Sequence, residues 1–347
     1  MGTRYKVGMY GGAFDPPHLG HLTNMAKAAA LCEELYVVIC WSEGRESTSK
    51  ELRYRWILNS LKHLDNVKIL FLEDDAATKA EYDADDYWQK GARAIKAAIG
   101  KTIDAVFCGS DYRGTGRFES LYAPEADVVY FDRAAIPISS TEIRANPSRY
   151  WDYIPAVCRD YYAKKVLIVG SQSVGKTVLT QNLALAYNTT FVAEVGRATC
   201  DFAGGEELMI ADDLYENLLR QRVNATDAAK TCNRLLFVDT DAITTLFYAR
   251  YLIKEPEKLA SCEKIAAGIN EINDWDLVLF LEPDVDFVQD GTRNEDFRAQ
   301  RIEYSERIKS ALREHGVEFN EISGDYAERF EAATRLIEEK LGITTRF

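Results

Sequence analysis

Short apolar segments of strand length alternate with helical stretches along the whole chain. In the first half, helices are predicted to begin near Gly20, Glu51 and Tyr87. The predicted strands of this half cover residues 5–10, 34–41, 67–72, 103–108 and 128–132. Strands that alternate with helices in this way are typical of α/β folds with parallel sheets.

A segment rich in proline and aromatic residues, 146–165, interrupts this pattern, and an apolar strand at 166–169 restarts it. The second half continues with strands predicted at 190–193, 235–239, 277–281 and 317–321, and with helices at 176–187, 207–230, 242–253 and 326–341. We therefore place a boundary near residue 163, with one domain over 1–162 and a second over 163–347. The predicted fold class is α/β, with two doubly wound domains, each built on a parallel sheet.

The net charge bears on the class of partner. The 347 residues carry 42 Lys and Arg against 55 Asp and Glu, a formal net charge of −13. Such a field repels the polyphosphate backbone of nucleic acids, so we expect no nucleic-acid partner, although a local basic pocket is compatible with this charge. The length fits roughly two domains, and 47% hydrophobic with 28% charged residues is ordinary for globular proteins.

The apolar pattern argues against a membrane protein and against a secreted one. The longest apolar runs, such as 36–41 and 277–281, are far shorter than a membrane span, and residues 1–10 lack the apolar region of a signal peptide. Seven cysteines, an odd number without a C-x-x-C pair, indicate reduced thiols. We expect a cytoplasmic protein with small-molecule partners and no membrane partner, and the sequence leaves its oligomeric state open, a homo-oligomer included.

The first candidate site is the segment GGAFDPPHLGHL, residues 11–22, which follows the first predicted strand. Glycines at a strand end let backbone N–H groups approach a phosphate closely. His18 and His21 are three residues apart where a helix begins, so both rings can face one anion that the helix dipole also attracts. The alternative is that the histidines cap the helix or bind a stray metal. A zinc site is disfavoured because no cysteine or third histidine lies at ligand spacing.

A second segment of the first half, ISSTEIR at 138–144, predicts another helix N-terminus, with Ser139 or Ser140 as N-cap and Glu142 close behind. Its hydroxyls, its free N–H groups and Arg144 form an anion cradle. Taken alone, this pattern is more typical of a plain capping box. Because the segment occurs in the same half as the candidate phosphate site at 11–22, we favour a second phosphate site here.

The second half opens with GSQSVGKT, residues 170–177, which has a strand before it and a helix after it, as a phosphate-binding loop requires. Backbone N–H groups of such a loop cradle phosphates, its lysine neutralises the β and γ charges, and its Ser or Thr hydroxyl binds Mg²⁺. The ATP-binding residues predicted here are Gly170, Ser173, Val174, Gly175, Lys176, Thr177 and Val178.

Two later strands end in polar residues that suit a kinase. Asp239 and Asp241 follow the strand at 235–239, where one can hold Mg²⁺ through water and the other can orient an attacking hydroxyl, and the sequence leaves open which does which. The alternative is that they serve only as an N-cap. Glu194 and Arg197 follow the strand at 190–193, and they suit ribose hydroxyls and a phosphate, respectively.

The stretch 279–301 leaves a strand and becomes charged. Its arginines, Arg293, Arg298 and Arg301, predict a lid that closes on the transferring phosphoryl group, and the alternative is a solvated charged helix. The acidic clusters at 73–75 and 83–86 lack the spacing of a metal-binding loop, so we expect them to be solvated.

The two segments of the first half closely resemble the H-x-G-H nucleotidyltransferase superfamily, in particular the adenylyltransferases of nicotinamide mononucleotide and of phosphopantetheine. The resemblance implies a Rossmann-like domain in which His18, His21, Ser140, Thr141 and Arg144, beside Gly11, Gly12 and Phe14, hold the ATP phosphates. It further implies adenosine contacts at Gly109 and Asp111, a nicotinamide ring stacked on Trp88, and mononucleotide contacts at Arg53 and Arg55. For Trp88, a place in the core is the alternative.

The combination with a phosphate-binding loop resembles the bifunctional nicotinamide-mononucleotide adenylyltransferase and ribosylnicotinamide kinase family. Four segments carry this match, namely the linker RYWDYIPAVCRDYYAKKV and the motifs EVGR, DTDAITT and LEPDVDFVQDGTR. The resemblance implies a P-loop kinase half that phosphorylates nicotinamide riboside with ATP, and a first half that converts the mononucleotide and ATP into NAD and pyrophosphate. Both steps would need Mg²⁺, and Glu194, Arg197 and Asp239 would bind the riboside.

Some family members carry an additional N-terminal repressor domain. The first predicted strand starts at residue 5, so we expect no DNA-binding regulation, and the form GGAFDPPHLGH is closer to that of stand-alone adenylyltransferases. The chief alternative function is a coenzyme A synthase-like fusion of phosphopantetheine adenylyltransferase and dephospho-coenzyme A kinase, which should lack the pairing of DTDxITT with EVGR. A nucleotide-sensing regulator with a degenerate kinase half is disfavoured by the intact Lys176, Thr177, Asp239 and Asp241.

Overall fold

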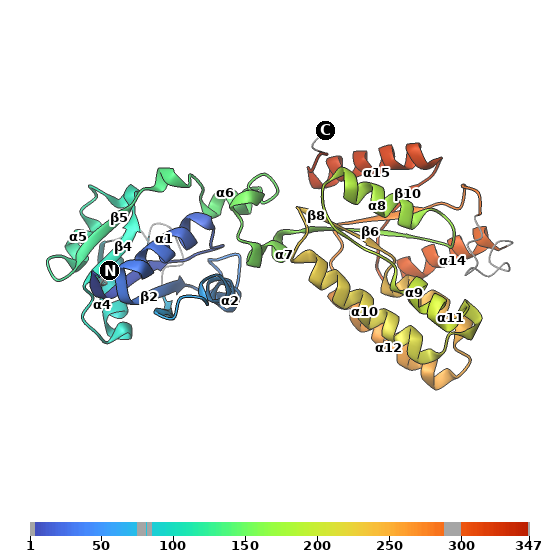
Figure 1. The fold of residues 1–347 in the computed structure, drawn as a ribbon, viewed down its shortest axis with the longest axis horizontal. Coiled ribbons are helices and arrows are strands. Elements are labelled where there is room, and N and C mark those ends of the chain that lie inside the picture. The colour runs from blue at the N-terminus through green and yellow to red at the C-terminus, as the bar shows by residue number, and fades with distance from the viewer. Residues whose placement is uncertain (1–3, 75–80, 82–84, 288–299, 346–347) are drawn as a thin grey trace. The chain divides into compact units, whose positions relative to one another are not determined.

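The computed structural model describes residues 4–74, 81, 85–287 and 300–345. The chain divides into two compact units, Met1–Cys158 and Arg159–Phe347. Each unit is a parallel sheet with helices on both faces (Figure 1).

The first unit is built on a five-stranded sheet in the order β3-β2-β1-β4-β5, and all four neighbouring pairs are parallel. Its strands are β1 (Tyr5–Gly12), β2 (Cys32–Trp41), β3 (Val67–Glu73), β4 (Ala105–Gly109) and β5 (Asp127–Phe131). The strand order reverses its direction at β1, so the carboxyl end of β1 lies where ligands bind in open α/β sheets.

Helices cover both faces of this sheet, which explains the unbroken apolar runs of its central strands. Along β2, Leu35, Val37 and Ile39 pack with α1 and α2, whereas Val38 packs on the opposite face with α4. The helices of the unit are α1 (Leu19–Leu31), α2 (Lys50–Leu61), α4 (Asp85–Ile99), α5 (Arg117–Tyr122) and α6 (Ser140–Ala145). Short 3-10 turns lie at η1 (Ser110–Tyr112), η2 (Arg133–Ala135), η3 (Trp151–Tyr153) and η4 (Ala156–Cys158).

The second unit is also built on a five-stranded parallel sheet, in the order β10-β9-β6-β8-β7. Its strands are β6 (Lys164–Gly170), β7 (Phe191–Val192), β8 (Leu235–Asp239), β9 (Leu277–Leu281) and β10 (Asn320–Ile322). The central strand β6 lies between β8 and β9, which places the carboxyl ends of all three strands at one edge.

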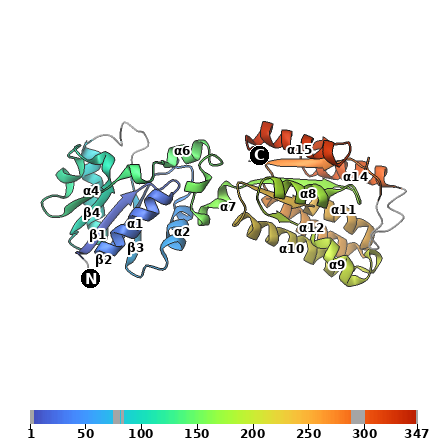
Figure 2. The same ribbon diagram turned by 45° about the horizontal axis from the view of Figure 1, so that its top comes forward.

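Two groups of helices enclose the second sheet. Helices α8 and α15 pack against the apolar side chains of one face, and α10, α11 and α12 form a separate apolar cluster (Figure 2). The helices are α7 (Arg159–Tyr162), α8 (Lys176–Ala186), α9 (Val195–Ala203), α10 (Ala211–Ala229), α11 (Ala242–Leu252), α12 (Pro256–Ile272), α14 (Arg301–Glu314) and α15 (Tyr326–Leu341), with a 3-10 turn at η5 (Glu206–Leu208).

The predicted fold class is confirmed, because both units are α/β with wholly parallel five-stranded sheets. The strands predicted at 235–239 and 277–281 have the predicted bounds. The last strand is shorter than predicted and begins at Asn320, and the sequence analysis missed helices α9 and α12. None of the helices in the described ranges is long and apolar enough to cross a bilayer.

Candidate active sites

The turn that follows β1 is held tightly by its own side chains. A Cβ at Gly12 would lie 2.9 Å from the ring of Phe14, so only glycine leaves room for this turn. Phe14 has a positive φ of 51°, and its ring stacks on Tyr10 with centroids 5.8 Å apart. The edge of His21 meets the same ring at 5.1 Å. The backbone after β1 is therefore fixed against the start of α1.

His18 and His21 lie side by side at the N-terminus of α1. Their rings stack with centroids 3.6 Å apart, and Nδ1 of His18 accepts a hydrogen bond from the backbone N–H of His21 over 3.4 Å. His18 is thus the N-cap of α1, which is the alternative role weighed for it. Nδ1 of His21 is buried without a hydrogen-bond partner among the described residues.

Both imidazoles are neutral at pH 7 in this structure. Burial and, to a lesser extent, the nearby Arg133 guanidinium lower the pKa of His18 to about 4, against the opposing effect of Glu142. Burial, the neighbouring His18 and Arg133 hold the pKa of His21 well below its usual range. A phosphate between the rings would favour their charged forms, because an opposite charge nearby offsets the cost of burial.

The second predicted phosphate segment is bound directly to the first. Ser139 caps α6 in a reciprocal capping box with Glu142, and Oγ of Ser140 donates to the carbonyl oxygen of Pro16 over 2.8 Å. Arg144 donates to the carbonyl oxygen of Asp15 and, over 3.2 Å, to Oγ1 of Thr141. The structure therefore brings residues 11–21 and 138–144 together at one edge of the sheet.

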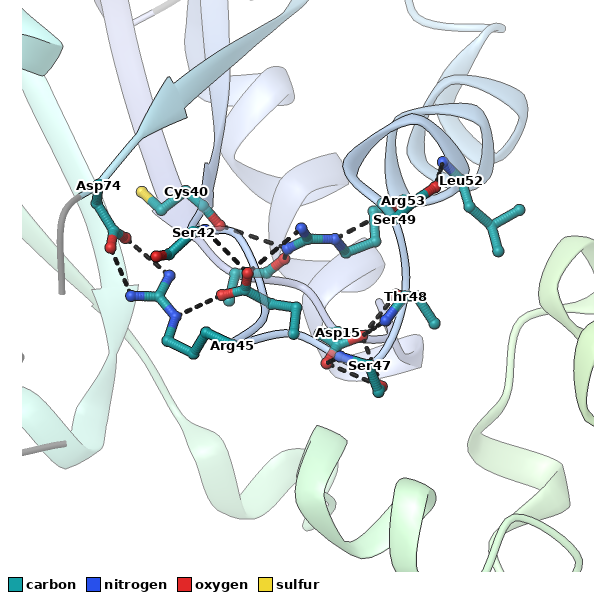
Figure 3. A network of polar contacts seen from close by, with 12 residues as sticks. Asp15, Cys40, Ser42, Arg45, Ser47, Thr48, Ser49, Leu52, Arg53 and Asp74 are labelled. Carbon is teal, nitrogen blue, oxygen red and sulfur yellow. Dashed lines mark hydrogen bonds and ion pairs between the residues drawn. The ribbon is translucent and has the colours of Figure 1, made fainter. Parts of the chain in front are cut away.

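A network of buried charges supports the turn from behind (Figure 3). The Asp15 carboxylate accepts hydrogen bonds from the backbone N–H groups of Ser47, over 2.8 Å, and Thr48, over 3.1 Å. Arg53 is only 1% exposed, and its Nη1 donates to the carbonyl oxygen of Ala13 over 2.6 Å. These contacts connect the first turn of α2 and the residues just before it to the turn that precedes His18.

Most predicted nucleotide contacts of the first unit line a single cavity of about 650 Å³. They are Gly11, Gly12, Phe14, His18, His21, Trp88, Gly109, Asp111, Ser140, Thr141 and Arg144. Arg53 and Arg55 do not line it, since Arg53 is buried behind the turn and Arg55 is exposed on α2. Trp88 lies against Tyr112 and Phe118, with ring centroids 6.0 and 5.8 Å away.

Three positively charged residues of this cavity were missed by sequence reasoning, namely Lys27, Arg45 and Arg133. Arg133 donates to the Asp111 carboxylate over 3.1 Å, and its charge lowers the pKa of both His18 and His21. In the sequence, only its position directly after a predicted strand indicated such a role. Arg45 binds the Asp74 carboxylate through two hydrogen bonds of 2.5 and 2.8 Å. The prediction of a solvated loop is wrong for Asp74, whose side chain is 8% exposed in this ion pair. Residues 75 and 83–84 lie outside the described residues.

The second unit forms a phosphate-binding loop between β6 and α8. A Cβ at Gly170, where φ is 149°, would lie 2.7 Å from the carbonyl oxygen of Leu281, and Gly175, the N-cap of α8, has a φ of 86°. Lys176 is 8% exposed, and its Nζ donates to the carbonyl oxygens of Gly170, over 3.2 Å, and Ser171, over 3.0 Å. The lysine side chain thus folds back over the loop, and its ammonium group binds loop carbonyl oxygens at the place where the loop would hold phosphates. Val174 is buried beneath the loop, whereas Val178 is exposed on α8.

The two aspartates after β8 have different surroundings. Oδ2 of Asp239 accepts a hydrogen bond from Oγ1 of Thr177 over 2.6 Å. Asp241 is the N-cap of α11, where its Oδ1 accepts from the backbone N–H of Thr244 over 2.9 Å, and its Oδ2 is buried without a partner among the described residues. Burial and the Glu194 charge raise the pKa of Asp239 to about 6 against the opposing effect of Lys176.

Two buried residues that the motifs did not indicate hold this site together. Arg329 of α15 is 1% exposed, and its guanidinium donates to the carbonyl oxygens of Val174 and, over 2.7 Å, Glu282. Gln221 of α10 donates to the carbonyl oxygen of Asp239 over 2.8 Å and accepts from the N–H of Val195 over 3.0 Å. The sequence did not indicate these roles, because each residue lies on a helix that is far from the phosphate-binding loop in the sequence.

A second cavity lies beside this loop, and Ser173, Lys176, Glu194 and Arg197 line it together. Residues missed by sequence reasoning complete the wall, namely Gln172, Cys200, Glu206, Met209, Leu214, Asn217, Gln221, Thr240, Thr245, Tyr248 and Leu252. The cavity therefore joins the phosphate loop to a mixed polar and apolar pocket, which is the combination that a nucleoside needs.

The predicted lid is described only at its end. Arg293 and Arg298 lie outside the described residues. Arg301 begins α14, and its Nη2 donates to the carbonyl oxygens of Pro283, over 2.6 Å, and Val285, over 2.5 Å. In this arrangement Arg301 anchors the start of α14 to the segment after β9.

Two family models match the chain, one in each unit. Residues 9–146 match the cytidylyltransferase-like family, and residues 165–329 match the AAA domain family. The assignment of the described sites to a nucleotidyl-transfer fold and a P-loop fold agrees with both matches.

Relatives extend the similarity over the whole chain. The trifunctional NAD biosynthesis/regulator protein NadR of Escherichia coli (strain K12) is 28% identical over 97% of this chain and 83% of its own length. The protein of the same name from Salmonella typhimurium (strain LT2) is 28% identical over 97% of this chain and 84% of its length. A phosphopantetheine adenylyltransferase of Streptococcus gordonii is 33% identical, but over only 37% of this chain and 65% of its own.

Solved structures share the fold of both units. The crystal structure of NadR protein in complex with NR has a TM-score of 0.83 at 22% identity and covers 99% of this chain and 98% of that one. The structure of NadR protein in complex with NAD and AMP-PNP has a TM-score of 0.80 at 22% identity and covers 100% and 99% of the two chains. The whole chain is thus similar to NadR proteins in sequence and in fold, which agrees with the resemblance that the motifs indicated: a cytidylyltransferase-like domain is followed by a P-loop domain.

Proposed function

We propose that the chain is a bifunctional enzyme of NAD biosynthesis. Its second unit phosphorylates nicotinamide riboside with ATP, and its first unit joins the resulting mononucleotide to the adenylyl group of another ATP, which yields NAD and pyrophosphate. The observation that carries this proposal is that each unit has its own phosphate-binding turn beside a cavity. Relatives named as NAD biosynthesis proteins match 97% of the chain, which supports the same assignment.

In the proposed kinase step, the 5′-hydroxyl of the riboside attacks the γ-phosphorus of ATP and ADP leaves. The loop around Gly175 and Lys176 supplies N–H groups and a cation for the β and γ phosphates. Glu194 lines the cavity next to Lys176, where its carboxylate accepts hydrogen bonds from the riboside hydroxyls. Arg197 lies one helical turn further along α9 and faces the same cavity.

Magnesium fits the oxygen donors of this site. The Thr177 hydroxyl and the Asp239 carboxylate lie 2.6 Å apart, and such hard oxygen ligands, with water and phosphate oxygens, are what Mg²⁺ takes. Oδ2 of Asp241, buried without a partner among the described residues, offers one more oxygen nearby in the chain. When bound, Mg²⁺ would neutralise the charge that develops on the transferring phosphoryl group. We assign Thr177 and Asp239 to this role.

In the proposed adenylyl transfer, a phosphate oxygen of the mononucleotide attacks the α-phosphorus of ATP and pyrophosphate leaves. His18, His21 and the N-terminus of α6 supply donors at one place, and fixed donors stabilise the charge on the phosphate oxygens in the transition state. Trp88 offers a ring face for the nicotinamide, and Gly109 with Asp111 offers contacts for the adenosine. No side-chain nucleophile is required.

We also infer that the enzyme works in the cytoplasm. Six of its seven cysteines are buried, which is typical of thiols that stay reduced in that compartment.

A substrate panel tests the proposed function. Full-length protein is incubated with ATP and either nicotinamide riboside, its mononucleotide, phosphopantetheine or dephospho-coenzyme A, with and without Mg²⁺. We expect phosphorylation of the riboside and formation of NAD from the mononucleotide, both dependent on Mg²⁺. Turnover of the pantetheine compounds without turnover of the nicotinamide compounds would assign the chain to the coenzyme A alternative.

A further inference from the structure

A glutamine and a glutamate form a pair in the cavity of the second unit, and the mechanism above does not use them. Gln172 lies at a variable position of the phosphate-binding loop, and Glu206 lies in the turn η5 between α9 and α10. Nε2 of Gln172 donates to both carboxylate oxygens of Glu206, over 3.1 and 3.0 Å. Both side chains line the cavity that also contains Lys176 and Glu194.

This pair has a defined orientation. The amide nitrogen of Gln172 must face Glu206, because an amide oxygen in its place would repel the carboxylate. Oε1 of Gln172 is therefore directed elsewhere, and it is buried without a hydrogen-bond partner among the described residues. The pair therefore keeps acceptors that no described residue fills, namely Oε1 of Gln172 and the remaining lone pairs of the Glu206 carboxylate.

The other residues of the cavity give this pair both polar and apolar surroundings. Lys176 and Glu194 lie at the phosphate and ribose end, as argued above, whereas Met209, Leu214 and Leu252 supply an apolar wall. A flat ring that packs against this wall would direct its substituent to polar groups of the same cavity. Two N–H donors on that substituent would match the acceptors that Gln172 and Glu206 present.

The charge of the pair adds a second criterion. Burial raises the pKa of Glu206, and the Glu194 and Glu207 charges act in the same direction while the hydrogen bond from Gln172 opposes them. A negative group placed beside this carboxylate would be repelled, whereas a pyridinium ring with an uncharged carboxamide carries the complementary positive charge.

We propose that Glu206, oriented by Gln172, selects the base of the riboside substrate by accepting hydrogen bonds from a carboxamide and by rejecting a carboxylate. The inference rests on the proposed riboside kinase function of this unit and names the group that sets its specificity. Nicotinamide riboside is then the preferred substrate, and nicotinic acid riboside, which carries a carboxylate on the same ring, is disfavoured.

The test compares kcat/KM for the two ribosides in the full-length protein. We expect the unaltered protein to prefer nicotinamide riboside by at least about tenfold, because a site built to pair with N–H donors leaves its acceptors unpaired against a carboxylate. In Glu206→Gln the charge is lost while the shape is kept, so this preference should narrow by about tenfold or more, mainly through a higher KM for nicotinamide riboside. Glu207→Gln is the matched control, since this exposed neighbour in the same turn does not line the cavity.

The outcomes separate the inference from the proposed function. If the unaltered protein phosphorylates neither riboside, the proposed kinase function fails. The inference is overturned if the unaltered protein phosphorylates nicotinamide riboside but Glu206→Gln leaves the ratio of the two kcat/KM values unchanged. This holds whether both values fall by the same factor or neither value falls, because Glu206 then does not recognise the base.

Folding of the variant is checked in the same samples by far-UV circular dichroism and thermal unfolding, because NAD formation reports only on the first unit and Glu206 lies in the second. Should Glu206→Gln fail to fold, Glu206→Asp keeps the charge and removes one methylene. That variant should still prefer nicotinamide riboside over the acid while losing efficiency, and a reversed preference would overturn the inference.

Discussion

The hydroxyl of Thr177 donates to the carboxylate of Asp239 across 2.6 Å, which joins the end of the phosphate-binding loop to the end of strand β8. The two residues are 62 positions apart in the sequence. Their contact places a hydroxyl and a carboxylate oxygen together beside the loop lysine, and this pair is the proposed Mg²⁺ site.

Thr177 variants test that pair. Thr177→Val removes the hydroxyl at nearly constant size, so we expect kcat for riboside phosphorylation to fall by about a hundredfold or more, as removal of positioned groups at phosphoryl-transfer sites does. Thr177→Ser keeps the hydroxyl and should retain kcat within about tenfold. The measurement is the initial rate of ADP release at saturating ATP over a range of Mg²⁺. Equal rates in the two variants would exclude the hydroxyl from the site.

His18 has two separable roles, and one substitution distinguishes them. His18→Asn keeps a side chain that caps a helix well but removes the imidazole. We expect NAD formation to fall by roughly a hundredfold or more, because a donor to the transferring phosphate is lost. Riboside phosphorylation by the same protein is the internal control and should be unchanged. Full NAD formation in this variant would mean that His18 serves only as the N-cap of α1.

Arg53 and Arg55 provide a matched pair for stability. Arg53→Met removes a buried guanidinium, its hydrogen bonds to the carbonyl oxygens of Ala13 and Cys40 and its ion pair with Glu46, so the free energy of unfolding should fall by about 3–5 kcal/mol. Arg55→Met alters an exposed side chain and should stay within about 0.5 kcal/mol. Urea unfolding followed by tryptophan fluorescence measures both.

The same pair of variants tests the sequence-based role of these arginines in mononucleotide binding. A higher KM for the mononucleotide in Arg55→Met, with unchanged stability, would support direct contact by Arg55. A higher KM in Arg53→Met without loss of stability would contradict the structural role that its burial indicates.

The pH dependence of stability follows from the buried histidines. The pKa of His18 is lowered to about 4 by burial, whereas histidines of an unfolded chain titrate near 6.5. Between these values the unfolded state binds a proton that the folded state does not, so the free energy of unfolding falls as the pH falls through this window and is constant above it. From pH 7 to pH 5 we expect a loss of roughly 2 kcal/mol from His18 alone.

Tryptophan fluorescence reports this loss selectively, because four of the five tryptophans lie in the first unit, at positions 41, 56, 88 and 151. His18→Gln should flatten the dependence. A free energy of unfolding that is constant or rises between pH 7 and pH 5 would contradict the burial of a neutral imidazole.

Several elements were predictable because their residues face apolar surroundings on every side. Strands β8 and β9 are wholly buried, so each is an unbroken apolar run with clear ends, and the predicted bounds match. Helix α9 was not predictable in this way. It begins at Val195, with two residues between it and the two-residue strand β7, and has a glycine at its second position. Oε1 of Gln221, on a different helix, accepts a hydrogen bond from the first N–H of α9. Tertiary contacts therefore decide where that helix starts.

The sequence by itself determined the two phosphate-binding turns and the α/β class, because glycine spacing and strand-to-helix order act over a few residues and read the same in any context. Only the tertiary structure decided which distant groups meet. The Asp15 carboxylate forms an ion pair with Arg144, and the Asp74 carboxylate forms one with Arg45. The Glu206 carboxylate accepts a hydrogen bond from the side chain of Gln172. The physical reason is that burial and pairing of charges depend on how the helices pack over each sheet, and local spacing carries no record of that packing.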